Sequence, residues 1–181
     1  MTFDITKFDV AAFDRILSCG LSQGLGEREK NVCIEAAICQ VLGLPHGDDP
    51  GCVTESLRRF KIILNDSPKW PSPVARAAGL HDLGLAQLDS KEKISSVSFS
   101  AKIAEKTIKV LIPTLFRELF PTNKELLAAA KRCEDEGTAD AATSAANAAA
   151  KYLCLSARLA LEVLIELDSP GIKLLGAYGE K

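Results

Sequence analysis

Histidine, tryptophan and tyrosine are scarce in this sequence, and the common nucleotide and hydrolase motifs are missing. The 181 residues include two histidines, one tryptophan and two tyrosines. No Walker-type loop, G-x-G-x-x-G or G-x-S-x-G motif occurs. The sequence therefore lacks the usual signatures of nucleotide binding and serine hydrolysis, and any imidazole chemistry depends on His46 and His81.

The sequence also lacks a large excess of either positive or negative charge, and it has no long apolar run. The net charge of −2 provides no overall field that would draw the chain to nucleic acid or to an anionic membrane. Few aromatic residues lie among the basic ones, which argues against a specific nucleic-acid interface. No apolar run approaches the roughly 18 residues of a transmembrane helix. We expect neither specific nucleic-acid binding nor membrane insertion.

The cysteines show no metal-binding or redox pattern. Six of them are scattered through the chain without a C-x-x-C pair, and no second pair of cysteines or histidines supplies zinc ligands. The N-terminal residues are acidic and interrupted, unlike a signal peptide. These features predict free thiols in a cytoplasmic protein that holds no metal and no cofactor.

Apolar spacing predicts an all-α fold. Apolar residues recur at intervals of three and four, and no run alternates as a strand does. The pattern of residues 90–100 fits either a short strand or a helix. The apolar residues continue from there at helical spacing, which favours a helix. We expect one helical domain over residues 1–181, a compact bundle or orthogonal array of about six to eight helices. Start and stop signals place these helices near 6–19, 27–42, 53–64, 73–88, 97–111, 122–135 and 137–167.

The stretch 31–52 organises the rest of the chain. Its first half is apolar nearly all round, which is typical of a buried helix. Gly43 ends that helix, and the loop Gly43–Cys52 carries a histidine and two aspartates on a backbone restricted by glycines and prolines. We expect helix 27–42 to pack against the second half of the last helix, 152–167, at the centre of the core.

Four residues are candidates for catalysis. Cys33 stands near a helix start, where the helix dipole lowers the pKa of a thiol, and His46 or His81 could serve as its base. Glu35 lies among apolar helix neighbours, so it is expected to pair with a lysine or arginine of another helix or to act as an acid or base. The plainer alternatives are a reduced core cysteine, a structural ion pair and hydrogen-bonded histidines.

Candidate binding residues lie in the loop and directly after it. They are His46, Asp48, Asp49, Arg58 and Arg59. The loop aspartates have a structural alternative, in which they bond nearby N–H groups and begin the next helix. Lys102, Lys106 and Lys109 form a basic stripe on one helix, and Arg58, Arg59 and Lys61 a second basic cluster. Solvated helix faces are the simpler interpretation of both.

Several tracts carry a resemblance to a known group of proteins. They are Glu35-Ala36-Ala37 leading into Gly43 to Pro50, then Leu64-Asn65-Asp66, Ala75-Arg76-Ala77 with Gly79-Leu80, and Leu161 to Leu164 with Ser169-Pro170-Gly171. The chain resembles small uncharacterised proteins of phages, prophages and bacteria that have an alanine-rich segment before the final helix. The resemblance implies a small accessory protein, without an assigned activity or catalytic residue.

The sequence leaves three functional hypotheses. The leading hypothesis is a non-enzymatic protein that binds a partner protein or sequesters a small ligand, with interference in a host pathway as one role. A cytosolic Cys-His hydrolase using Cys33 is the second. The third is a structural homo-oligomer, such as a homodimer, joined through the alanine-rich residues 139–150.

Overall fold

The computed structural model describes residues 4–28, 30–119, 121–122, 124–136 and 153–175. Helices dominate this part of the chain, and its one β-pairing is an isolated bridge between Gly26 and Val32. The predicted all-α class is therefore confirmed. No helix within these ranges is both long and apolar enough to cross a membrane.

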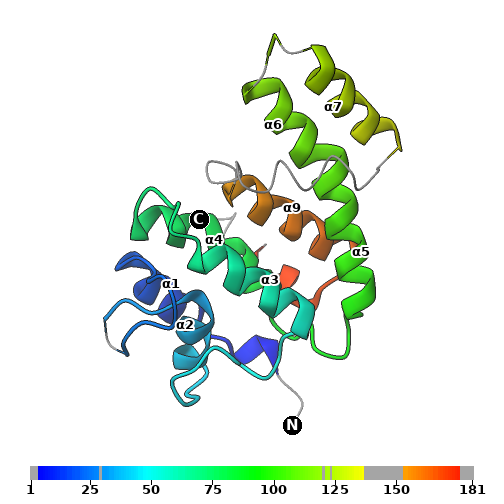
Figure 1. Cartoon of the computed structure of the whole chain (residues 1–181). Coiled ribbons are helices and arrows are strands. Elements are labelled where there is room, and N and C mark those ends of the chain that lie inside the picture. Colours follow the sequence, from blue (N-terminus) through cyan, green and yellow to red (C-terminus); the bar gives the residue numbers. More distant parts are fainter. Residues whose placement is uncertain (1–3, 29, 120, 123, 137–152, 176–181) are drawn as a thin grey trace.

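Short and medium helices follow one another along the chain (Figure 1). In chain order they are η1 (Ile5–Lys7), α1 (Val10–Ser18), α2 (Ile34–Val41), α3 (Glu55–Asp66), α4 (Pro73–Ala86), α5 (Ser96–Lys106), η2 (Thr107–Leu111), α6 (Ile112–Leu119), α7 (Lys124–Glu136), α9 (Leu153–Glu166) and η5 (Pro170–Leu174).

Helix α4 is the centre of the main core. The Ser72 hydroxyl accepts the Ala75 N–H and Pro73 takes the first turn, as the sequence predicts. Its buried face packs against α1, α2, α9 and η5. Helix α2 packs against α1, α3 and α4. Packing of α2 on the last helix is not among the main helix–helix contacts of the described residues, although both helices contribute side chains to the same hydrophobic core and α4 contacts each of them.

Helix α2 begins later than the sequence predicts. Residues 27–28 and 30–33 are not helical, because Gly26 has a φ of +73° and the chain turns back to form the Gly26–Val32 bridge. The side-chain oxygen of Asn65, on α3, then accepts the N–H of Ile34 at 3.2 Å. Thus a residue 31 positions away satisfies a donor at the start of α2.

Helices α5, η2 and α6 form one long rod that extends beyond the main body, with α7 folded back beside α6 (Figure 1). In the middle, η2 is a π-helical turn in which the Ile112 N–H reaches Thr107 O, five residues back. Pro113, which lacks an N–H donor, follows directly. A second, smaller core gathers residues of η2, α6, α7 and α9 here.

Two sequence predictions fall on the last part of the chain. The final helix is described from Leu153, and the alanine-rich residues 139–150 lie outside the described residues.

The described cysteines are free thiols: Cys19, Cys33, Cys39, Cys52 and Cys133. Segment 90–100, which the sequence left between strand and helix, contains turns up to Ser95. Ser95 then caps α5 by accepting the Ser98 N–H.

Candidate functional site

A fully buried ion pair lies beneath the connector 22–33 and the loop 43–53. Glu35 on α2 and Lys61 on α3 have no exposed side-chain surface, and Oε1 of the glutamate is 3.0 Å from Nζ of the lysine. Gln87, just after α4, donates its amide to Glu35 Oε2 at 3.1 Å. Three separate parts of the chain thus meet at one polar centre within the apolar core.

Burial opposes both charges of this pair. It raises the pKa of Glu35 and lowers the pKa of Lys61, and the attraction between the two groups offsets only part of each effect. Glu35 Oε1 and Lys61 Nζ have each other as partners, whereas Gln87 Oε1 accepts no hydrogen bond within the described chain. The centre therefore keeps unused acceptor capacity.

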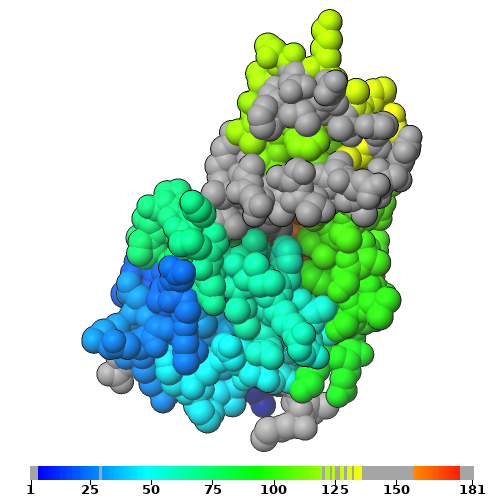
Figure 2. Space-filling model, in the orientation of Figure 1, coloured from blue at the N-terminus to red at the C-terminus, as the bar shows by residue number. Residues whose placement is uncertain are grey.

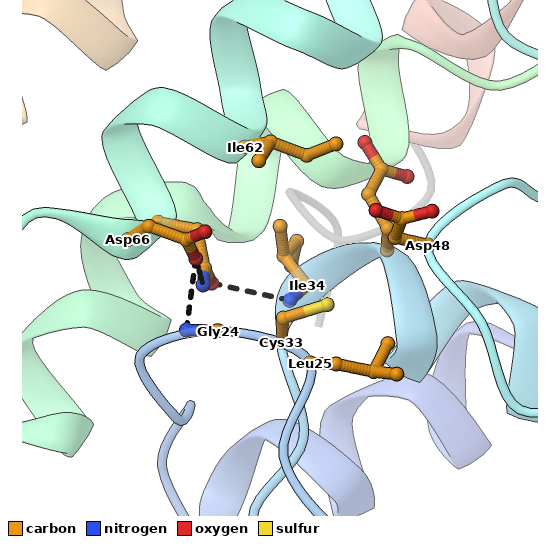
Figure 3. A pocket seen from close by; sticks show the side chains of 9 residues that line it. Gly24, Leu25, Cys33, Ile34, Asp48, Ile62 and Asp66 are labelled. Carbon is orange, nitrogen blue, oxygen red and sulfur yellow. Dashed lines mark hydrogen bonds between the residues drawn. The ribbon is translucent and has the colours of Figure 1, made fainter.

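A small cavity of about 30 Å³ opens beside Glu35. Figure 3 shows connector residues Gly24 and Leu25 on one side, Cys33 and Ile34 at the start of α2, and Asp48 near the opposite end. The complete lining is Gly24, Leu25, Cys33, Ile34, Glu35, Asp48, Ile62, Asn65 and Asp66. It combines three carboxylates with three aliphatic side chains.

Helix α3 holds the connector above this cavity. Asp66 Oδ1 accepts the Gly24 N–H at 2.9 Å and the Asn65 amide at 2.8 Å, and the same amide donates to Ser22 O at 2.9 Å. Dashed lines in Figure 3 mark the bond from Gly24 to Asp66 and the bond from Ile34 to Asn65. Our sequence analysis did not single out Asn65, Asp66 or Gln87 as site residues. The sequence did contain a signal that Lys61 is buried, because this residue lies between Leu57 and Leu64 on the apolar face of α3. Its assignment to an exposed basic cluster is wrong.

Cys33 is the N-cap of α2 and is 4% exposed. Its Sγ accepts the Ala36 N–H at 3.3 Å. Burial raises the pKa of the thiol despite this hydrogen bond, so the lowered pKa expected at a helix start is not found. Neither histidine forms a recorded hydrogen bond with Cys33 in the described structure: His46 contacts Gly26 O, and His81 contacts two aspartates.

The loop 43–53 is fixed by contacts to its neighbours. His46 Nε2 lies 3.1 Å from Gly26 O of the connector, and Arg58 Nη1 lies 3.3 Å from Asp48 Oδ1. Asp49 Oδ1 accepts the Gly51 N–H at 2.9 Å, which is the local self-capping the sequence suggests. However, no loop side chain caps α3. Its N-cap is Thr54, whose hydroxyl donates to Ile94 O at 3.1 Å instead.

The basic side chains of the two clusters that the sequence predicts are engaged with acids. Arg59 pairs with Glu55 one turn away on α3. Lys102 and Lys106 reach Glu166 of α9, each at 2.9 Å, so this part of the stripe joins two helices. Such pairing leaves less free positive charge for a phosphate-bearing ligand than the sequence indicates.

His81 lies apart from the cavity, in a groove between α1 and α4. Its Nε2 is 2.8 Å from Asp14 Oδ1 and its Nδ1 is 2.7 Å from Asp82 Oδ1. Burial works against protonation, but the hydrogen bonds to Asp82 and Asp14 outweigh it and raise the pKa of His81. The structure therefore brings Cys33, Glu35 and Asp48 together around one cavity and leaves His81 elsewhere.

No group of three or more His, Cys, Asp or Glu residues in the described ranges is arranged to hold a metal ion. Arg58 is brought to the loop, whereas Arg59 pairs along its own helix. The chain matches no family model, no curated protein and no solved structure among those compared with it.

Proposed function

We propose that this chain is a non-enzymatic binding protein whose recognition surface consists of the described residues of the connector, 22–28 and 30–33, and the loop 43–53. The observation that carries the proposal is the fixed arrangement of the loop: His46 contacts the connector while Asp48 is held from α3. Because the loop is already ordered, it loses less entropy on binding than free side chains would. In Figure 2 the blue to cyan atoms of this part of the chain form one continuous surface at the lower left.

The polar groups of this surface remain available to a partner. His46, Asp48 and Asp49 are all exposed, although each has one internal contact. Beneath them lies the nearly fully buried helix α2, which supplies a rigid support. Loops with polar groups on a rigid scaffold are common binding sites. A partner protein or a small ligand at this surface is consistent with an accessory protein that acts on another cellular component.

The arrangement around Cys33 gives less support to a Cys-His hydrolase. Nucleophilic catalysis requires a thiolate near a base that is within hydrogen-bond reach. Cys33 is buried with a raised pKa, and the recorded hydrogen bonds of the two histidines go to other groups. A binding role requires neither a reactive thiolate nor a histidine base beside it.

A double variant tests the proposal. His46→Ala with Asp49→Ala removes two polar groups of the surface, whereas Glu105→Ala with Lys109→Ala removes an exposed ion pair of α5 and serves as the matched control. The immobilised parent, loop variant and control are incubated with cell extract, and bound proteins and small molecules are identified by mass spectrometry. Melting curves verify that all three are folded.

We expect the parent and the control to retain the same specific component and the loop variant to lose it while remaining folded. Retention of that component by the folded loop variant would contradict the proposed surface. Loss by the control as well as by the loop variant would also contradict it, because binding would then depend on α5.

A further inference from the structure

The outer side of α4 is a ridge with a groove on each side of it. Val74, Ala78 and Asp82 follow one another at four-residue intervals along the exposed line of this helix. The groove on the α1 side contains His81, and the groove on the α9 side contains Leu161. Ala78 and Asp82 border both grooves, so the ridge and the two grooves form one continuous surface, which we call the α4 surface.

The α4 surface is largely apolar and has few long side chains. Val74 is 61% exposed, although it lies on the helix at the centre of the main core. Ala75, Ala78 and Gly79 line the groove on the α9 side. Side chains this short allow the backbone of another helix to approach α4 to the interhelical distance of about 8–10 Å found in packed helices. The shape of the surface therefore fits a helix.

Two opposite charges face the groove on the α9 side without pairing with each other. Arg158 of α9 is exposed, and it takes part in no ion pair with any residue that the structure describes. Asp82 lines the same groove, and its printed contact is with His81 of its own helix. A partner for this surface consequently needs an acid opposite Arg158 and a base opposite Asp82.

The positions of these charges along α4 identify the partner. The Ser169 hydroxyl, just after α9, donates to Ala86 O at the end of α4, 83 positions earlier, and the two helices pack side by side. They therefore run in the same direction, and the same offset puts Arg158 level with Ala75. Asp82 lies two turns further, about 10 Å along the axis. The midpoint between the two charges falls between Ala78 and Gly79, where the side chains are shortest.

We propose that the α4 surface binds a second copy of this chain, with the two α4 helices antiparallel about a twofold axis at Ala78 and Gly79. Rotation about this axis places Asp82 opposite Arg158 of the partner subunit, and symmetry gives the same pair a second time. Each copy supplies both the acid and the base that the other needs, and the helices approach most closely at the smallest residues.

This interface goes beyond the proposed binding function. It shares no residue with the connector or the loop 43–53, so a dimer would carry two copies of that recognition surface. It also differs from the self-association that the sequence suggests, which would use the alanine-rich residues 139–150.

Sedimentation of the full chain tests the proposal, together with charge-reversed variants. We expect the mass of the parent to rise from one chain toward two as its concentration increases. Arg158→Asp and Asp82→Arg each place like charges opposite one another, so each should weaken self-association at least about tenfold. Lys131→Asp, on exposed α7, is the matched control and should leave it unchanged. A parent that keeps the mass of one chain up to about 1 mM, a dissociation constant weaker than any specific dimer here requires, would overturn the proposal.

Mixing the two charge-reversed variants distinguishes pairing between copies from pairing within one chain. In the mixed dimer every acid again faces a base, so the mixture should associate about as tightly as the parent although neither variant does so alone. A mixture that stays monomeric would overturn the proposal, and so would an equal loss in the Lys131→Asp control.

Melting curves verify that the variants are folded, because Asp82→Arg also removes a contact of His81. If that variant does not fold, Arg158→Asp and Ala78→Glu decide, since both positions are exposed. Ala78→Glu places two carboxylates at the twofold axis and should weaken self-association at least about tenfold. Undiminished self-association in either folded variant would contradict the interface.

Discussion

Lys61 Nζ lies 3.0 Å from Glu35 Oε1, and neither side chain has any exposed surface. Removing two charges from water costs several kcal/mol for each, and the attraction between them repays this cost only in part. A pair of this kind is weak support for stability by itself.

Substitution of one partner should be far more damaging than substitution of both. We expect Glu35→Leu or Lys61→Met alone to lower the free energy of unfolding by about 3–5 kcal/mol, because each leaves an unpaired charge in the core. The double variant should lose much less than the sum of the two. Urea unfolding of the four proteins measures this, with Lys131→Met on exposed α7 as the control that changes little. Additive losses would mean that the two charges do not stabilise each other.

Part of this site could be predicted from the sequence. The apolar neighbours of Glu35 on α2 predict burial, and burial predicts a basic partner from another helix, which Lys61 is. Helical spacing could also have identified the partner, because among Arg58, Arg59 and Lys61 only Lys61 lies one turn from both Leu57 and Leu64 on the apolar face of α3. Gln87 donates a hydrogen bond to Glu35 although the two residues are 52 positions apart, and no local sequence pattern indicates such a contact.

The start of α2 shows a similar limit. Glu27 and Glu29 suit a helix N-terminus, and the local pattern therefore predicts a helix from residue 27. Tertiary contacts override it: Asn65 accepts the Ile34 N–H and Asp66 accepts the Gly24 N–H, so α3 fixes the chain on both sides of the predicted helix start. Local capping signals were sufficient at Ser72, where donor and acceptor are three residues apart.

His81 gives the fold a pH-dependent contact between α1 and α4. Its pKa is raised above 6.5 by Asp82 and Asp14, so its contribution is complete below about pH 6.5 and is lost as the pH rises through the raised pKa. We expect the stability difference between the parent and His81→Gln to be at most about 1 kcal/mol, because all three side chains are partly exposed to solvent. Thermal melts of both proteins from pH 5 to 9 should show the difference shrinking with pH. A constant or growing difference would contradict the assignment.

The backbone of Gly171 packs against the end of α4 more closely than a residue with a side chain could. A Cβ at this position would lie 2.4 Å from Leu85 O and 2.6 Å from Ala86 O, both of them backbone atoms. The neighbouring Ser169 hydroxyl donates to Ala86 O at 2.6 Å, which holds η5 against the same turn. The C-terminal segment is thus seated on the central helix by a close backbone contact and a buried hydrogen bond.

Gly171→Ala should consequently force η5 away from α4. We expect a loss of about 1–3 kcal/mol in the free energy of unfolding, as for other overpacked positions. Gly47→Ala is the matched control, because its Cβ would meet only Pro45 O at 3.9 Å. Urea unfolding compares the two variants, and amide exchange at Leu85 to Leu88 follows the displaced segment. If Gly171→Ala is as stable as Gly47→Ala, the contact does not seat the C-terminal segment, and α4 is held by α1, α2 and α9 without it.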